Sequence, residues 1–326
     1  KSCMQHHSKA IDMQLRNSTT ESDRNLKDAL PHPPLCDTTK LMRAHPWLAV
    51  VVFWACSPAV PKQPMKSSTM TGVNTATVAS APVPAQTEPG PSPQPTQPTS
   101  PPVQDTSCPS GMQWIAGGSF LMGSEQGDGD EKPVHRVELD GFCLDETPVT
   151  VGEYARCSGC TKPNTGKDCN WGILGRGNHP VNCVDWNQAT AYCRLVGKQL
   201  PTEAQWEYAA RGGARQLEYP WGSEQPQGRA CWSRTEGTCA VGTYPSGAFT
   251  LKDMAGNVWE WLQDWYGPYP RSATKNHVHE SYGSSRVCRG GSWNYHFPSG
   301  LRGSDRIFVT PVSRYNSLGF RCAKAK

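Results

Sequence analysis

The sequence predicts one disulfide-rich α+β domain with little regular secondary structure, confined to residues 108–326. Three observations predict it. Short strand-like segments are separated by glycine and proline, three short segments carry helix signals, and 11 of the 14 cysteines follow Cys56. About 215 residues can bury a core, but elements this short need covalent cross-links. So many cysteines also indicate an oxidising compartment.

The composition excludes several classes of protein. Only 36% of the 326 residues are hydrophobic and 29 are proline, which excludes a polytopic membrane protein and a coiled coil. The 32 basic and 28 acidic residues give a net charge of +4, and no basic run indicates nucleic acid as a partner. No fixed-period repeat is present, which argues against a solenoid or a propeller.

The first 56 residues contain a candidate export signal. Residues 1–41 are polar and are expected to be disordered, as in an over-extended gene start. Residues 42–56 hold a short basic segment and then nine apolar residues at 47–55, too few to cross a bilayer as a helix but typical of a signal peptide. The run ends at Ala55-Cys56, which resembles a lipoprotein signal and predicts lipidation of Cys56. A plain secretory signal with an incidental cysteine is the alternative.

Residues 57–107 are predicted to be a disordered tether. They hold 12 of the 29 prolines and four charged residues, so they cannot bury enough apolar surface to offset their chain entropy. We expect an extended, polyproline-biased spacer that holds the domain away from a membrane surface. A proline-rich ligand for a partner domain is the weaker alternative.

Strands and helices of the domain follow from local signals. The first strand is expected over 111–119, bent at Gly117-Gly118, and three more are expected at 120–122, 134–139 and 287–289. Three helices are predicted from their start signals, which are Thr150 with Glu153, Asp185, and Thr202 with Gln205. The side chains expected to face the core are Trp186, Ala189, Cys193 and Val196 in the second helix and Trp206, Ala209 and Ala210 in the third.

Seven motifs occur in order along this domain. They are Gly117–Ser124, His179–Trp186, Leu200–Gly213, Tyr219–Gly222, Asp253–Trp261, Arg289–Trp293 and Leu318–Cys322. The set resembles the formylglycine-generating enzyme family, also called the sulfatase-modifying factor domain, over essentially all of 108–326. The resemblance implies the variant of the C-type-lectin-like fold that this family adopts.

The resemblance also implies where a copper site would lie. The founding enzymes use copper and oxygen to convert a sulfatase cysteine to formylglycine, and two cysteines after the Gly-Ser-Trp motif hold Cu(I). Here those positions are Tyr295 and Gly300, and neither supplies the soft sulfur ligand that Cu(I) prefers. Copper and the founding activity are therefore not expected.

Polar residues beside these positions are candidates for an inherited cleft. The candidates are Ser292, Trp293, Tyr295, His296 and Arg302. We interpret them as groups that line a groove. A Ser292/His296 hydrolase is a remote alternative, because no nucleophile elbow and no orienting acid surrounds the pair.

Calcium is the second ligand that the resemblance implies. The matching ligands are the carboxylates of Asp253 and Glu260 and the carbonyls of Gly256 and Val258, all of which are oxygen donors of the kind Ca²⁺ requires. A capping aspartate followed by an aromatic core segment is the alternative. The family's second calcium site is not expected, because its matching loop near 230–244 contains no aspartate.

The cysteines of the domain are expected to form disulfides. The resemblance implies a Cys193–Cys322 bond, and Cys231–Cys239 and Cys108–Cys143 are two further expected pairs. Cys157, Cys160, Cys169 and Cys183 remain for two bonds whose pairing the sequence leaves open, and Cys288 is left free. The spacing of these cysteines does not match a zinc site.

His277 and His279 are the remaining pair of possible metal ligands. They lie in a polar, serine-rich segment, and the sequence offers no third ligand. We therefore expect a solvated loop rather than a metal site.

These observations predict an envelope-tethered domain of bacteria that binds a peptide, protein or glycan, or serves as a structural module. The alternative is a formylglycine-generating oxidase with a non-standard site. We expect a monomer that contacts the membrane through its lipid anchor only, in the outer membrane or periplasm, or else secreted.

Overall fold

A computed structural model describes residues 107–325. The predicted signal peptide, the lipidation at Cys56 and the tether lie outside the described residues. Within the described part of the chain, no helix combines the length and the apolar character needed to cross a membrane.

The first of three small sheets joins the two ends of the domain. Strand β4 (Phe142–Asp145) lies between β1 (Met112–Ile115) and β10 (Ala323–Ala325), and both pairings are antiparallel. The predicted strand at 111–119 is in fact two strands, β1 and β2 (Gly118–Met122), which belong to different sheets. The chain can turn between them because a Cβ atom at Gly117 would lie 2.5 Å from the Leu139 carbonyl oxygen, so only glycine fits.

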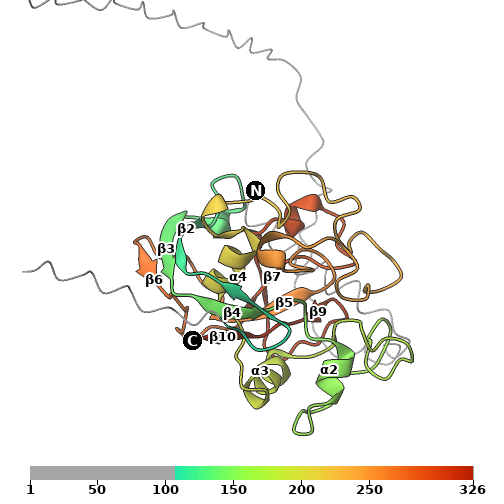
Figure 1. Ribbon diagram of the computed structural model, residues 1–326. Helices are drawn as coiled ribbons and strands as arrows, with labels where there is room; N and C mark the ends of the chain where they lie inside the picture. Colours follow the sequence, from blue (N-terminus) through green and yellow to red (C-terminus); the bar gives the residue numbers. More distant parts are fainter. Residues whose placement is uncertain (1–106, 326) are drawn as a thin grey trace, which may run out of the picture. The chain divides into compact units, whose positions relative to one another are not determined.

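The other two sheets hold the remaining strands (Figure 1). In one, β3 (His135–Leu139) pairs with β2 and with β6 (Thr274–Lys275). The other has the order β8 (Ile307–Val309), β7 (Arg286–Arg289), β5 (Trp259–Trp265) and β9 (Leu318–Gly319). The sequence predicted β3 and β7 within one residue at each end, but it did not predict β5 as a strand.

The three predicted helices are present with their predicted caps. They are α2 (Val151–Ala155), α3 (Trp186–Leu195) and α4 (Glu203–Ala210), and each begins with a capping box in which the N-cap side chain accepts a backbone hydrogen bond. Val196 is not a core residue: it is 41% exposed, because α3 ends at Leu195 and the buried face ends with it. The short 3-10 helices are η2 (Gly129–Glu131), η3 (Gly213–Arg215), η4 (Ala248–Thr250) and η5 (Pro298–Leu301).

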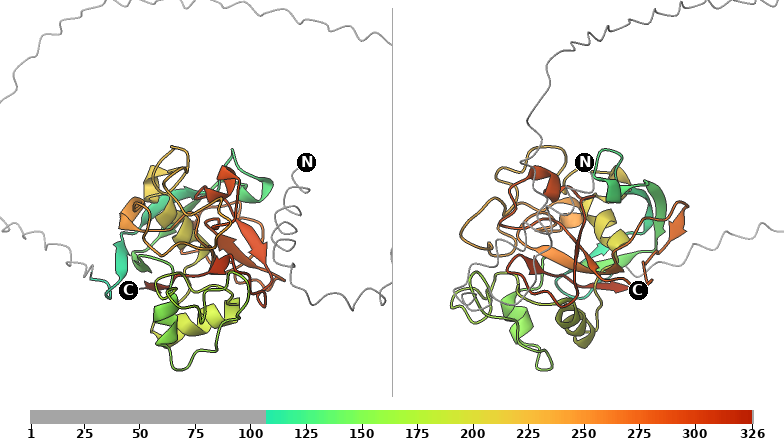
Figure 2. Two further views of the ribbon diagram at one scale, coloured as in Figure 1. Left: turned by 90° about the vertical axis from the view of Figure 1, so that its right-hand side faces the viewer. Right: turned by 180° about the vertical axis from the view of Figure 1, so that it is seen from behind.

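Helices α2 and α3 lie side by side at one end of the domain, whereas α4 lies among the strands (Figures 1 and 2). One core cluster surrounds Trp206 of α4, a second surrounds Trp261 of β5 and Phe320, and a smaller third cluster contains Leu301. All three of these aromatic side chains are fully buried. Aromatic residues of this size supply most of the burial that a domain with short elements needs.

Five disulfides cross-link the described residues. The three expected pairs are present: Cys108–Cys143, Cys193–Cys322 and Cys231–Cys239. The pairs that the sequence left open are Cys157–Cys160 and Cys169–Cys183, and Cys288 is free and buried, as predicted. Cys193–Cys322 closes a loop of 129 residues, for which chain entropy gives about 4–5 kcal/mol of stabilisation.

A buried ion network holds the start of α4 to the sheet of β5 and β7. Glu203 accepts hydrogen bonds from Arg289 at 2.7 Å and from Arg306 through both of its oxygens at 2.7 Å. Burial alone would raise the pKa of Glu203, but Arg306 and Arg289 hold that pKa below its usual value of 4.5. Glu207, one turn further on, lies 2.8 Å from Arg289 and 2.7 Å from Arg211.

We expect Glu203→Gln to lower the free energy of unfolding by about 3–5 kcal/mol at pH 7, because it leaves two buried guanidinium groups without their shared carboxylate. Chemical denaturation measures the change, and Glu236→Gln is the matched control, since Glu236 is 81% exposed in its pair with Arg234. Because the folded pKa of Glu203 lies below the unfolded value of 4.5, its contribution is present above that pH and is lost as the pH falls through the folded pKa. The two variants should therefore differ most near neutral pH and least in acid; an equal, small loss in both would contradict the network's role.

Candidate functional site

The two positions that correspond to copper ligands lie against each other. Tyr295 follows β7 in the chain and Gly300 lies in η5. A Cβ atom added to Gly300 would overlap Cε1 of Tyr295 and lie 2.6 Å from its Cδ1. The tyrosine ring therefore occupies the space that a side chain at position 300 would need.

Aromatic residues hold the Tyr295 ring in this place. Trp259 packs edge-on against it with ring centroids 5.6 Å apart, and Phe297 does so at 5.9 Å. Two backbone hydrogen bonds also tie this segment to a neighbouring loop: Ser233 N donates to the Tyr295 carbonyl at 3.0 Å, and Arg234 N donates to that of Trp293 at 2.8 Å. An aromatic cluster without a thiol does not fit Cu(I), which prefers soft sulfur ligands.

The predicted cleft residues do not act as one group. Ser292 is 1% exposed, and its hydroxyl donates to Asn294 Oδ1 at 2.8 Å. His296 is exposed and places Nδ1 3.0 Å from the hydroxyl of Ser233. Trp293 is buried, and its indole N–H donates to the Asn316 carbonyl. Ser292 and His296 thus have different partners, and a serine that is covered by the protein is poorly placed to attack a substrate.

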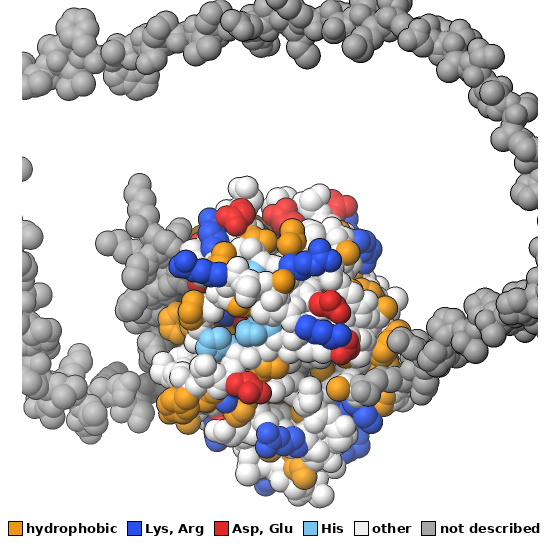
Figure 3. Space-filling model, turned by 90° about the vertical axis from the view of Figure 1, so that its left-hand side faces the viewer, with side chains coloured by type: hydrophobic (Ala, Val, Ile, Leu, Met, Phe, Trp, Pro, Cys, Tyr) orange, Lys and Arg blue, Asp and Glu red, His pale blue; other side chains and the backbone are white. Residues whose placement is uncertain are grey.

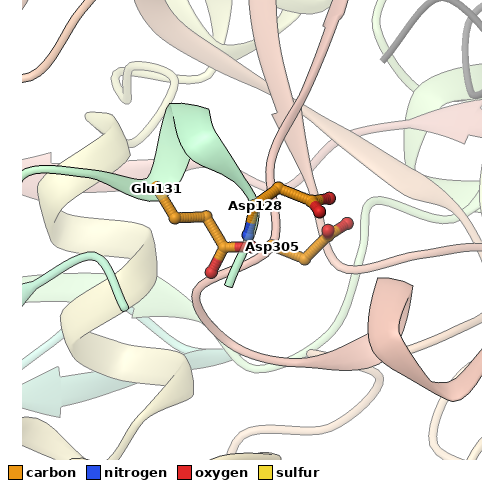
Figure 4. Close-up of side chains that lie close together, drawn as sticks. All are labelled: Asp128, Glu131 and Asp305. Atoms are coloured by element: carbon orange, nitrogen blue, oxygen red, sulfur yellow. Dashed lines mark hydrogen bonds between the residues drawn. The ribbon is translucent and has the colours of Figure 1, made fainter. Parts of the chain in front are cut away.

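Arg302, the last of these candidates, belongs to an acidic cluster that the sequence analysis missed. Asp128, Glu131 and Asp305 place carboxylate oxygens within 4.8 Å of one another, and Figure 4 shows Asp128 and Asp305 pointing the same way while Glu131 points elsewhere. Arg302 donates to both oxygens of Glu131 at 2.9 and 2.6 Å and lies 3.7 Å from Asp305.

The guanidinium of Arg302 supplies one positive charge to this cluster. Burial would raise the pKa of Glu131, but the bonds from Arg302 hold that pKa below its usual value. Arg302 therefore neutralises Glu131, and we assign this ion pair a structural role. The dense acidic run at 127–131 is the sequence signal that could have drawn attention to it.

The predicted calcium ligands lie at the start of β5. Asp253 is half-buried with a positive φ of 54°, and its Oδ2 accepts a hydrogen bond from Gly242 N at 2.7 Å. Burial and the nearby charge of Glu260 raise the pKa of Asp253 above its usual range. Asp253 is thus an oxygen donor whose negative charge is incompletely balanced, and this fits a hard cation.

Glu260 is already engaged. Its Oε2 accepts from Trp206 Nε1 at 2.8 Å and from Arg321 Nε at 2.7 Å, and its Oε1 accepts from Arg321 Nη2 at 2.8 Å. Any calcium in this loop would therefore share Glu260 with Arg321, and Asp253 would supply the unshared carboxylate. The backbone carbonyls of Gly256 and Val258 complete the predicted donor set.

A cavity of about 420 Å³ lies elsewhere in the domain. Helix α3, strands β5 and β7 and the segment 278–280 contribute to its wall. Its residues include Trp186, Thr190, Gln263, Trp265, His279 and Arg286. These residues are far apart in the sequence and form no motif, so only the tertiary structure brings them together.

The segment with the two histidines is more buried than expected. His277 and His279, for which we predicted a solvated loop, are each half-buried, and their ring centroids lie 6.5 Å apart. Burial, with the nearby charges of His279 and His135, lowers the pKa of His277. Among the described residues, the three histidines do not form a group with ligand atoms within 4.8 Å of one another. Histidine side chains are visible near the centre of the face shown in Figure 3.

The fold defines the class of protein. The described part of the domain has few helices, three small sheets and a disulfide framework, and two solved structures match its overall fold. PvdO from Pseudomonas aeruginosa matches with a TM-score of 0.58 and 26% identity over 66% of this chain and 94% of its own. Treponema denticola variable protein 1 matches with a TM-score of 0.56 and 24% identity over 66% and 95%, which shows the fold alone.

Sequence comparison gives the family. The model of the sulfatase-modifying factor enzyme 1-like domain matches residues 96–326, so the chain belongs to this family. The formylglycine-generating enzyme of Streptomyces coelicolor is 35% identical over 65% of this chain and 88% of its own length. The serine/threonine-protein kinase pkn1 of Chlamydia caviae is 39% identical over 65% of this chain, but the match spans only 38% of that relative.

Restoring the two cysteines tests the assignment of Tyr295 and Gly300. We expect the double variant Tyr295→Cys/Gly300→Cys to retain about one Cu(I) per chain in competition with a chelator, and the unaltered protein to retain none, because only the variant offers a thiolate pair. Copper content is measured after gel filtration.

A serine pair at the same positions is the matched control, since it has nearly the same size and no sulfur. Gly300→Cys alone should be destabilised by overlap with the Tyr295 ring. Stoichiometric copper in the unaltered protein would contradict the assignment.

Proposed function

We propose that this chain is an envelope-tethered, non-copper module that binds a peptide, protein or glycan or serves a structural role. The observation that carries the proposal is the Tyr295 ring, which fills the space over Gly300 where a second ligand would stand. The domain keeps the fold and the ordered motifs of its family, but the chemistry of the founding site requires two thiolates. Because the fold is kept while the Tyr295 ring occupies the position of a copper ligand, a binding role is favoured over oxidation of a cysteine.

Cys288 does not replace the missing thiolates. It is fully buried in β7, and burial raises the pKa of its thiol well above the usual range. It also lies in the core cluster that contains Trp261. The alternative function, a formylglycine-generating oxidase with a non-standard site, would therefore need ligands other than an accessible thiolate pair.

The envelope part of the proposal is supported by sequence. The apolar run at 47–55, Cys56 and the proline-rich residues 57–107 together favour export, lipidation and a spacer. In this arrangement the lipid is the only contact with the membrane, and the domain acts as a monomer.

The oxidase assay tests the function directly. Purified protein with Cu(I) is incubated in air with a peptide that contains Cys-x-Pro-x-Arg, and mass spectrometry follows the peptide cysteine. We expect no formylglycine above a metal-free control, while the S. coelicolor relative serves as the positive control. Conversion of the peptide by this chain would overturn the non-catalytic proposal and direct the search for ligands to accessible groups near Tyr295, beginning with His296.

Calcium bound at Asp253, Gly256, Val258 and Glu260 is part of the same proposal and predicts a change in stability. We expect Ca²⁺ to raise the melting temperature, because a ligand at one hundred times its Kd stabilises the folded state by about 2.7 kcal/mol. Differential scanning fluorimetry measures the shift in chelator and in millimolar Ca²⁺. Asp253→Asn should abolish the shift, and Asp168→Asn, in another loop, is the matched control; an unchanged melting temperature in the unaltered protein would contradict the calcium assignment.

A further inference from the structure

An arginine is stacked between two tryptophans in the wall of the cavity. The guanidinium carbon of Arg286 lies 3.5 Å from the ring centroid of Trp265 and 3.8 Å from that of Trp186. Its Nη1 donates to the Gln263 carbonyl at 2.6 Å. Stacking on both faces fixes the plane of the group, so its remaining N–H bonds have a defined direction before any ligand arrives.

The charge of Arg286 has no counter-ion in the described part of the chain. No carboxylate there lies within 4.0 Å of it, whereas Lys198 on the same cavity wall is paired with Asp145 at 2.6 Å. The acid whose charge acts on Arg286 is Asp264, and its two oxygens accept from Glu203 N and His279 N, both at 2.7 Å. Burial lowers the pKa of Arg286 to about 10, because the charge of Asp264 offsets its desolvation only in part.

Three further polar atoms of the cavity residues have no hydrogen-bond partner among the described residues. They are Thr190 Oγ1, Gln263 Oε1 and His279 Nδ1. Buried polar atoms are normally paired, and an unpaired one destabilises the folded state because it has lost its hydrogen bond to water. They come from α3, β5 and the 278–280 segment, and all three residues line the same cavity as Arg286.

We propose that this cavity binds an acidic sugar unit, with the sugar carboxylate on Arg286 and its hydroxyls on Thr190, Gln263 and His279. The inference rests on the proposed binding role and names its site and ligand class. The guanidinium fork matches a planar carboxylate, and the volume of about 420 Å³ lies within the usual range of ligand sites.

The unpaired atoms favour a sugar over an acidic peptide side chain. Gln263 Oε1 only accepts hydrogen bonds, whereas the hydroxyl of Thr190 can donate or accept. A carboxylate side chain offers only acceptors at its tip, but sugar hydroxyls donate and accept on several sides of a compact ring. Arg194 at the cavity adds positive charge, and Glu280 is the one acidic residue of its wall.

Calorimetric titration of the full chain with D-glucuronate and D-galacturonate tests the site. D-glucose is the matched neutral control, and acetyl-aspartate amide and inorganic phosphate represent an acidic peptide and a simple anion. We expect at least one uronate to bind with a Kd tenfold or more below those of glucose, the aspartate derivative and phosphate.

Variants locate the binding. Arg286→Gln should weaken uronate binding tenfold or more, and Thr190→Val, which keeps the stacked arginine, should weaken it several-fold. Arg136→Gln on the exposed side of β3 should leave binding unchanged. Near-UV circular dichroism checks that each variant is folded. If Arg286→Gln does not fold, the binding measured with Thr190→Val tests the site.

Equal binding of glucuronate and glucose, preference for the aspartate derivative or for phosphate, or no uronate binding would each overturn the inference. These outcomes are separate from the oxidase assay. Failure of uronate binding with no formylglycine product leaves the proposed function intact, whereas formylglycine production overturns that function whatever the cavity binds.

Discussion

The buried carboxylate of Glu203 determines how helix α4 meets the strands of the domain. Two fully buried arginines, Arg289 and Arg306, both donate hydrogen bonds to this carboxylate. Removing charges from water costs several kcal/mol each, so this network is stable only when every donor has an acceptor. Helix α4, strand β7 and the chain before β8 must therefore meet in one arrangement.

The same constraint explains how a domain with so few long elements has a defined core. The pair of core clusters around Trp206 and Trp261 is joined by polar contacts as well as by packing: Trp206 donates to Glu260, and Glu260 is held by Arg321. Hydrophobic contacts are non-directional. The ion networks add direction, and the five disulfides reduce the entropy of the unfolded chain.

The parts of the fold that depend on nearest neighbours were predictable from sequence. The caps at Thr150, Asp185 and Thr202 are local hydrogen bonds, so the helix starts could be derived without tertiary structure. Strand β5 could not, because its burial is nearly continuous rather than alternating and its partners β7 and β9 lie later in the chain. The cavity could not be predicted from the sequence either, because Trp186 and Arg286 come into contact only when α3 packs against the sheet.

Asp264 connects the core network to the cavity. Its carboxyl group accepts from the backbone of Glu203 on one side and of His279 on the other, so the charged start of α4 and the wall of the cavity share one side chain. Burial and the charge of Glu203 raise the pKa of Asp264 to about 7. A folded pKa above the unfolded value means that the folded state holds its proton more tightly, so this group's contribution to stability decreases as the pH rises from about 4 through about 7. Glu203 acts with the opposite sign, because its folded pKa is lowered. The pH dependence due to Glu203 thus lies below 4.5, and that due to Asp264 lies between about 4 and about 7. The charge of Glu203, which the arginines maintain, is one cause of the raised pKa of the residue that accepts a hydrogen bond from His279.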